Sequence, residues 1–432
     1  MHLNLFAFAA GHHAGAWRTP DSSVDRLGEI AYWEELARTA ERGLFDAIFL
    51  ADGQAAGLGG IGSGPVWFLE PITTLTALAQ ATEHIGLVTT VSSTFWHPFH
   101  AARLIGSLDH ISGGRAGINV VTSMTDAEAQ NHNMTELPEH TERYAKAAEF
   151  IEVLQKLWDS WPMEAITADR AGIYTEQAQL KFLDHRGRWF EVAGPLNLPQ
   201  PPQGRPVLFQ AGASEPGRDL AARHAEGIYA VAWDLDMARE YRLDIRSRAV
   251  ALGRDPDQIA VMPGLVTYIG DTVEQAKEKQ RELNSYLPIA DSLRQLAFFV
   301  GCDTSDWVLD EPVPQLPPLA DFTGPKGRYA TILRIIDSAQ PTVRELLGLL
   351  AAGGGHATFI GTPEMIADEI ERWIKGGGAD GFNLMPPTLP GGIEDFVDLV
   401  VPELQQRGLF RTSYEGTTLR SHLGLPQYLN IN

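Results

Sequence analysis

Cysteine and long apolar runs are nearly absent from this sequence, and each absence excludes a class of protein. Cys302 is the one cysteine among 432 residues, so no internal disulfide can form and we expect a reducing, cytoplasmic setting. No apolar run approaches the about 18 residues that a membrane span requires. The opening MHLNLFAFAAG lacks the basic flank and the length of a signal peptide, and we interpret it as a first strand. We therefore expect no membrane partner.

Signatures of metal and nucleic-acid binding are missing as well. Because the chain has neither a CxxC nor an HExxH motif, we expect no bound metal. It carries 55 acidic against 34 basic residues, a formal net charge of −21. Such a charge repels phosphate backbones, so we expect no nucleic-acid partner.

One stretch imitates a nicotinamide-binding fingerprint. GLGGIG at residues 57–62 satisfies G-x-G-x-x-G, but in that fingerprint the third glycine lies in an opening helix. Here Pro65 and Pro71 follow, and proline prevents a helix from growing through its position. We interpret the stretch as a loop between a strand and a helix, and infer that reducing equivalents reach the protein from elsewhere.

Short apolar runs alternate with helical patterns along most of the chain, which is typical of βαβ units around a buried parallel sheet. The predicted strands are Leu3–Ala9, Phe45–Ala51, Ile85–Val91, Ala116–Val121, Val207–Ala211, Ile228–Ala232, Ile259–Val266 and Gly381–Met385. The predicted helices include Ile30–Arg42, Pro71–Glu83, Glu139–Trp158, Asp219–Glu226, Met237–Leu252 and Glu364–Lys375. Eight such units favour a closed (β/α)8 TIM barrel over an open doubly wound sheet.

Two insertions interrupt this alternation within a single predicted domain, residues 1–432. The first, at about 162–205, suggests a short hairpin, and the second, at about 287–355, is rich in proline and glycine. We expect the second to cover the active site with AAGGGHATF as a hinge, the alternative being a disordered linker between two domains. Near the C-terminal tail at about 409–432, the amphipathic stretch FVDLVVPELQQRGLF is expected to pack on the barrel or on another subunit.

The residues that follow the predicted strands are candidates for the active site, because a barrel enzyme builds its site from these loops. In the turn QAGAS after the fifth strand, small residues allow backbone N–H groups to approach an anion at a helix start. Gly212 and Ser214 are therefore candidate phosphate ligands, although Ser214 is equally suited to cap the helix. His13, then His12 and His97, are candidates for moving a proton near neutral pH.

Four long strings resemble one enzyme family throughout their length. They are SLDHISGGRAGINVVTS (107–123), EHTERYAKAAEFIEVLQKLWDSW (139–161), PVLFQAGASEPGRDLAARHAEG (206–227) and DGFNLMPPTLPGGIEDFVDLVVPELQQRGLFRTSYEGTTLRSHLGL (380–425). The chain resembles the nitrilotriacetate monooxygenase branch of the bacterial-luciferase-like flavin enzymes, which includes dibenzothiophene-sulfone and long-chain-alkane monooxygenases. That resemblance implies a TIM barrel that receives reduced FMN from a separate NAD(P)H-dependent flavin reductase and activates O2 as a flavin C4a-hydroperoxide.

The resemblance also implies roles for individual residues. Tentative catalytic roles go to His13 and to Asn119, which would border the flavin ring. The alternative for His140 is a helix cap and for Tyr144 a place in the core. Met124 stands where the alkane-oxidising relative has a histidine, which argues against alkane hydroxylation. Contacts to FMN are implied for Asp52, Thr90, Ser123, His140, Tyr144, Gly212 and Ser214.

The substrate implied by this resemblance is a small organosulfur or organonitrogen compound, oxygenated or cleaved at a C–S or C–N bond. Arg18, Arg115 and Arg328 are candidates for binding an anionic substrate. Two alternatives stay open: hydride transfer with the deazaflavin F420 on the same barrel, and a catalytically silent flavin-binding subunit. Relatives form homodimers or homotetramers, so we expect a homo-oligomer.

Overall fold

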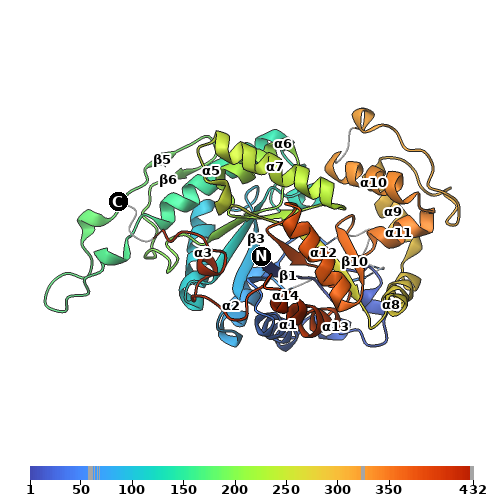
Figure 1. Cartoon of the computed structure of the whole chain (residues 1–432). Coiled ribbons are helices and arrows are strands. Elements are labelled where there is room, and N and C mark those ends of the chain that lie inside the picture. Colours follow the sequence, from blue (N-terminus) through green and yellow to red (C-terminus); the bar gives the residue numbers. More distant parts are fainter. Residues whose placement is uncertain (57–61, 63, 66, 68, 323–325, 429–432) are drawn as a thin grey trace.

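Parallel strands form a closed ring at the centre of the molecule (Figure 1). The computed structural model describes residues 1–56, 62, 64, 65, 67, 69–322 and 326–428, so residues 57–61 of the fingerprint-like stretch lie outside the described part. Eight strands of that part make up the ring, and each overlaps one of the predicted strands, which confirms the (β/α)8 barrel. In ring order they are β1 (His2–Ala7), β2 (Ala47–Leu50), β3 (Gly86–Ser92), β4 (Ala116–Val121), β7 (Val207–Gln210), β8 (Gly227–Ala230), β9 (Ala260–Ile269) and β11 (Gly381–Leu384).

Helices surround the ring (Figure 1), and their buried residues are mostly apolar. In α12, for example, Ile366, Ile370 and Trp373 are buried at helical spacing, and Thr362 caps the helix start by accepting a hydrogen bond from the Met365 N–H. No helix within the described ranges has the length and apolar character to cross a membrane. The outer helices are α1 (Ile30–Arg42), α2 (Pro71–Ala81), α3 (Pro98–Ser112), α4 (Asp126–Gln130), α5 (His140–Trp158), α6 (Glu215–His224), α7 (Leu235–Ala251), α8 (Val273–Ser285) and α12 (Pro363–Lys375).

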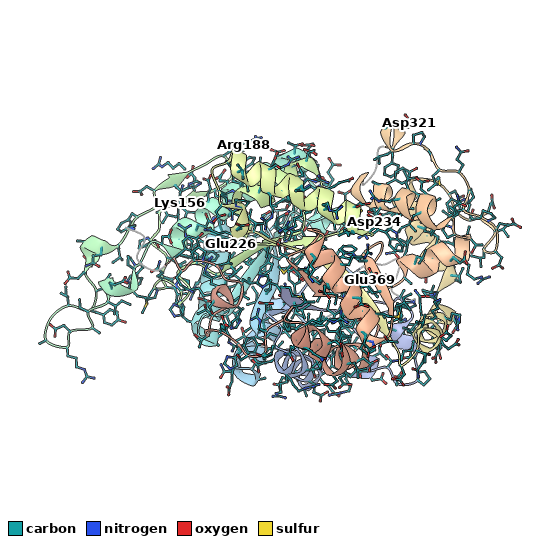
Figure 2. All side chains as sticks on the ribbon, in the orientation of Figure 1. Lys156, Arg188, Glu226, Asp234, Asp321 and Glu369 are labelled. Atoms are coloured by element: carbon teal, nitrogen blue, oxygen red, sulfur yellow. The ribbon has the colours of Figure 1, made fainter. Side chains whose placement is uncertain are left out.

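The first insertion extends away from the barrel and contains a short hairpin, β5 (His185–Arg186) with β6 (Glu191–Val192), at the left of Figure 1. A partly buried carboxylate holds it to α5, because Glu149 accepts hydrogen bonds from the backbone N–H groups of residues 188–190. Arg188 of the same turn, labelled in Figure 2, also pairs with Glu142 at 2.8 Å.

The second insertion forms three helices, α9 (Ile289–Val300), α10 (Lys326–Ala339) and α11 (Val343–Leu350), at the right of Figure 1. These helices have a hydrophobic cluster of their own, which includes the buried Leu296, Tyr329 and Leu346. Arg334 of α10 pairs with Asp234 at the start of α7, and Asp234 is labelled in Figure 2. The described helices of this insertion are therefore packed together and are not a disordered linker, whereas residues 301–322 between α9 and α10 are largely irregular.

The segment AAGGGHATF, which was expected to be a hinge, is not a loop throughout. Its last three residues begin a strand, β10 (Ala357–Gly361), which pairs in parallel with the second half of β9, Ala357 opposite Leu265. β9 is long enough to pair with β8 over its first half and with β10 over its second. The second half of β9 thus gains a partner strand that was not predicted.

The C-terminal region packs on the barrel, as the first of the two alternatives for FVDLVVPELQQRGLF expects. α13 (Gly391–Asp395), a π-helical turn at Phe396–Val400 and α14 (Val401–Gln406) bury their apolar side chains against α1 and α12. Farther on, α15 (Leu419–His422) inserts Leu419 beside the barrel strands. A Cβ on Gly86 of β3 would lie 2.5 Å from a Leu419 methyl, so this strand position needs glycine.

Candidate active site

Three neighbouring cavities lie where the strands of the ring end. The β4 cavity, about 620 Å3, is lined by loops after β2, β4 and β7 and by Tyr144 of α5. The central cavity, about 590 Å3, reaches from β1 and β8 to the helices of the second insertion. The outer cavity, about 550 Å3, lies between the loop after β1 and α9. Ala211 borders the first two and His12 the last two, so the three cavities share walls.

The turn after β7 forms one wall of the β4 cavity and is held open by two glycines. A Cβ on Gly212 would lie 2.8 Å from the Gly217 Cα and 3.0 Å from the Tyr144 hydroxyl oxygen. The Gly212 N–H donates to the Gln210 side chain at 2.7 Å. Ser214 caps α6 by accepting from the Gly217 N–H at 3.3 Å, and its own O–H stays available to donate.

His140 and Tyr144 lie on the first turns of α5, and the Tyr144 hydroxyl faces this turn. Their ring centroids are 5.0 Å apart. Among the described residues, neither the Tyr144 hydroxyl nor the His140 ring makes a hydrogen bond. Partial burial lowers the pKa of His140, and the nearby Arg143 lowers it further. The cap of α5 is Glu139, so the alternative that His140 caps the helix is not realised.

Asp52 and Ser123 line the same cavity from other loops. Burial raises the pKa of Asp52, while a hydrogen bond from the Gln54 amide opposes this rise. Ser123 has a φ of +59°, a left-handed conformation that is uncommon outside glycine. Its hydroxyl is 2.8 Å from the Ser92 hydroxyl, and its backbone carbonyl accepts from Arg143. The left-handed residue is therefore fixed by side chains from two neighbouring elements.

Thr90 and Asn119 lie opposite each other on the paired strands β3 and β4. The Asn119 amide donates to the Thr90 hydroxyl at 3.1 Å. The Asn119 carbonyl oxygen is buried and has no hydrogen-bond partner in the described part of the chain. Neither residue is among the side chains that line the three cavities.

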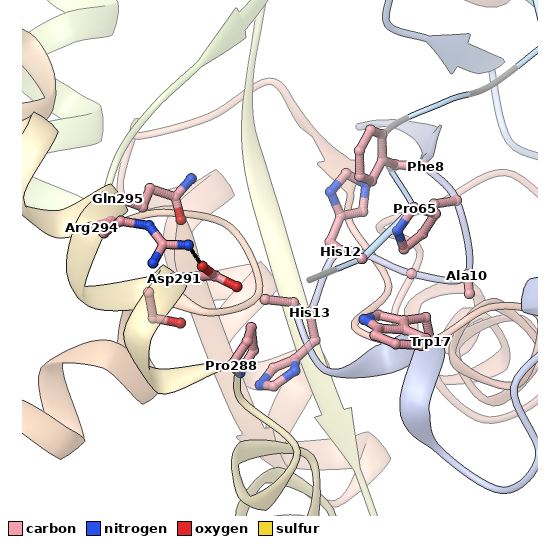
Figure 3. Close-up of a pocket in the computed structure, with 15 residues that line it drawn as sticks. Phe8, Ala10, His12, His13, Trp17, Pro65, Pro288, Asp291, Arg294 and Gln295 are labelled. Atoms are coloured by element: carbon pink, nitrogen blue, oxygen red, sulfur yellow. Dashed lines mark ion pairs between the residues drawn. The ribbon is translucent and has the colours of Figure 1, made fainter. Parts of the chain in front are cut away.

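His13 and His12 border the outer cavity (Figure 3). The His13 Nδ1 accepts from the Gly15 N–H at 3.0 Å, which leaves Nε2–H to donate to Asn284 of α8 at 3.0 Å. The Nε2 of His12 is 2.9 Å from the Phe6 carbonyl, to which it donates. Burial lowers the pKa of both imidazoles to about 4, so both are neutral at pH 7. A proton-transfer role for His13 stays a prediction, and it would require one of these two bonds to open.

The His97 imidazole makes a structural hydrogen bond at the start of a helix. Its Nδ1 accepts from the Phe99 N–H at 3.2 Å and thereby caps α3. Likewise, every guanidinium nitrogen of Arg115 donates to protein oxygens, and Arg18 is exposed beside Trp17.

Sequence reasoning missed the polar cluster that borders the central cavity. The Tyr229 hydroxyl of β8 lies 3.1 Å from the His356 Nε2 and 2.9 Å from the Met385 sulfur. The two rings stack with centroids 5.2 Å apart, and burial lowers the pKa of His356 to about 3. The sequence does contain an indication for Tyr229, because its side chain is the one polar side chain of the otherwise apolar strand β8. His356 lies in the glycine-rich segment, where no periodicity points to the barrel.

Comparison with known proteins points to one family. The family model for luciferase-like monooxygenases matches residues 3–380. N-acetyl-S-(2-succino)cysteine monooxygenase from Bacillus subtilis (strain 168) is 43% identical over 99% of this chain and 97% of its own. Nitrilotriacetate monooxygenase component A from Aminobacter aminovorans is 42% identical over 100% of this chain and 97% of its own. The crystal structure of a riboflavin lyase with modified FMN and riboflavin has a TM-score of 0.87 and 31% identity, covering 99% of this chain and 96% of that one.

Proposed function

This chain belongs to the luciferase-like monooxygenase family, and from that premise we propose that it uses reduced FMN and O2 to oxygenate or cleave a small organosulfur or organonitrogen compound. It is thus an enzyme that inserts oxygen, on a barrel whose strand ends carry the site. The substrate class rests on the relatives, whose names include a thioether-bearing cysteine derivative and an aminopolycarboxylate.

The cofactor assignment rests on the space bordered by Gly212, Gly217, Tyr144 and Ser214, which we call the cradle. Only a residue without a Cβ leaves space between Gly212, Gly217 and the Tyr144 hydroxyl. The start of α6 favours negative charge there, and the hydroxyls of Tyr144 and Ser214 donate to no acceptor among the described residues. His140, whose ring contacts that of Tyr144, adds an imidazole that makes no hydrogen bond to the described residues. A phosphate group fits this donor set, so we assign the phosphate of FMN to it.

The remaining predicted contacts fit the other end of FMN. Asp52 and Ser123 line the same cavity and would contact the ribityl chain or the ring. The buried Asn119 oxygen, which lacks a donor in the described part of the chain, would accept a hydrogen bond from a flavin N–H. Thr90 would position Asn119 through the 3.1 Å bond between them. We therefore assign Asn119 the contact with the reacting ring on the basis of this unpartnered oxygen, and because Asn119 does not line the β4 cavity, the contact requires the oxygen to become accessible when FMN binds.

The chemistry divides between the cofactor and the chain. Bound reduced FMN would supply the two electrons that O2 activation requires. The chain's own task is to exclude water and to orient the substrate, and the apolar side chains of α9–α11 around the central cavity serve that task. His12, neutral and bordering two cavities, would offer its Nδ1 as a hydrogen-bond acceptor, since its Nε2–H is engaged by Phe6.

Two partners complete the proposal. A separate NAD(P)H-dependent flavin reductase would supply reduced FMN, in keeping with the name component A of the Aminobacter aminovorans relative. We also propose a homodimer or homotetramer. α7 supports this assembly, because Leu243 and Val250 are seven residues apart on it and are 55% and 61% exposed.

The test measures FMN binding and coupled turnover in the full chain. Tyr144→Phe removes only the hydroxyl that faces the cradle, and a lost hydrogen bond to a charged group weakens binding about ten- to a hundredfold. Tyr174→Phe, on a side chain 65% exposed in the first insertion, is the matched control. We expect O2 uptake and product with an added flavin reductase, and a weaker FMN affinity in Tyr144→Phe alone. Preference for reduced F420 over reduced FMN, or equal FMN affinity in all three proteins, contradicts the proposal.

A further inference from the structure

The central cavity contains a cation that no carboxylate of the described chain neutralises. Arg328 of α10 is the single Lys, Arg, Asp or Glu among the residues that line this cavity. Its Nη1 donates to the backbone carbonyl of Gly354, and its guanidinium lies 5.3 Å from the centroid of the Phe299 ring. Its Nε and Nη2 have no acceptor among the described residues. Burial lowers the pKa of Arg328, since water no longer solvates the charge fully.

Arg328 is half-buried, and its contacts differ from those of two fully buried arginines, Arg115 and Arg420. Arg115 also lacks a carboxylate partner, but all three of its guanidinium nitrogens donate to protein oxygens. Arg420 is buried and forms a two-point ion pair with Glu226 at 2.7 and 2.8 Å. A buried charge without such partners costs free energy. Among these three, only Arg328 has guanidinium nitrogens without an acceptor in the described part of the chain, and its side chain lines the central cavity.

The surroundings of Arg328 favour an anionic ligand. The glycines of AAGGGH allow the guanidinium to approach, because a Cβ on Gly354 would lie 2.6 Å from its Nη1. His356, also on the cavity wall, is kept neutral by burial and by the positive charge of Arg328. The one acidic residue lining the adjoining outer cavity, Asp291, is paired with Arg294 (Figure 3).

We propose that Arg328 binds a carboxylate of the substrate in the central cavity, so that the enzyme acts on an anionic organosulfur or organonitrogen compound. The inference rests on the proposed monooxygenase function. The free Nε and Nη2 form the planar fork that pairs with two carboxylate oxygens. The apolar wall made by Leu296, Phe299 and Ile332 strengthens this pairing by lowering the local dielectric. Ser292 and Gln295 of α9 border the same space and add neutral hydrogen-bonding groups.

The experiment compares charged ligands with neutral counterparts of the same skeleton. The ligands are two thioether dianions, 2,2′-thiodiacetate and N-acetyl-S-carboxymethylcysteine, and their dimethyl esters. Binding to the full chain is measured by calorimetry with and without FMN, and FMN affinity is measured separately. The proteins are wild type, Arg328→Gln, Arg328→Lys and Arg103→Gln, the last removing one positive charge from an exposed site on α3.

We expect wild type and Arg103→Gln to bind at least one dianion about tenfold or more tightly than its ester. Arg328→Gln loses that preference, Arg328→Lys keeps part of it, and FMN affinity is the same in all four proteins. If wild type shows no preference for either dianion, or if Arg328→Gln keeps it, the role of Arg328 is wrong while the FMN proposal stands. If wild type fails to bind FMN, the proposed function itself is wrong, whatever the dianion results.

Discussion

Gly212→Ala is a severe test of the phosphate cradle, because its effect follows from backbone geometry. The added Cβ would lie 2.8 Å from the Gly217 Cα, and carbon atoms in contact stay about 3.5–4.0 Å apart. The turn after β7 and the start of α6 must therefore separate by about 1 Å. Overpacking of this kind costs about 1–3 kcal/mol of folding free energy. The same separation moves Tyr144 and Ser214 off any group that they hold together, and we expect FMN affinity to fall about tenfold or more.

The assay combines urea unfolding with quenching of flavin fluorescence on titration of the protein. Gly391→Ala is the control, since a Cβ there meets nothing within 4 Å and the position begins α13. We expect the control to match wild type in both measurements. If Gly212→Ala binds FMN as tightly as wild type and unfolds at the same urea concentration, the contact geometry around Gly212 has been misjudged and the phosphate lies elsewhere.

Two further predictions concern the energetics of residues away from the cradle. Arg420→Met leaves the Glu226 carboxylate buried and unpaired, so the free energy of unfolding should fall by about 3–5 kcal/mol, while the folded protein retains its FMN affinity. Arg407→Met is the control on a more exposed ion pair, and it should lower the free energy of unfolding by about 1 kcal/mol or less. Equal losses in urea unfolding would contradict this ranking. For His13 the folded pKa of about 4 lies below the ordinary 6.5, so its contribution to stability is present above pH 6.5 and is lost as pH falls toward 4. Between pH 6.5 and 4, the free energy of unfolding should therefore fall by about 3 kcal/mol less in His13→Gln than in wild type. Parallel curves of unfolding free energy against pH would show that His13 is not held neutral.

The barrel was predictable because its strands are short, apolar and buried on both faces, and that pattern depends on local sequence. All eight predicted strands lie in the ring. β10 was not predicted, because AAGGGHATF has the composition of a flexible segment and its strand character depends on pairing with β9, far away in sequence. The helices of the second insertion were only partly apparent, since proline and glycine between them masked the periodicity.

The site was predictable to the extent that it follows strand ends. Asp52, Ser123 and Gly212 occupy such positions, and all three line one cavity. Tyr144 was predicted only from the family resemblance, because no local sequence pattern indicates that α5 lies against the loop after β7. Tyr229 and His356 were missed because their meeting depends on which face of β8 looks inward and on the course of a glycine-rich loop.

The net charge of −21 bears on the proposed recognition of an anionic substrate by a cavity residue. A negative surface repels anions in solution, and at physiological salt exposed charges act over about 8 Å. An anionic substrate therefore gains its attraction only after it enters a cavity where a cation faces it at low dielectric. Arg328 meets that condition, and it comes from α10 of the insertion, not from the barrel. The barrel can thus keep one cofactor site unchanged while the inserted helices determine which compounds reach it.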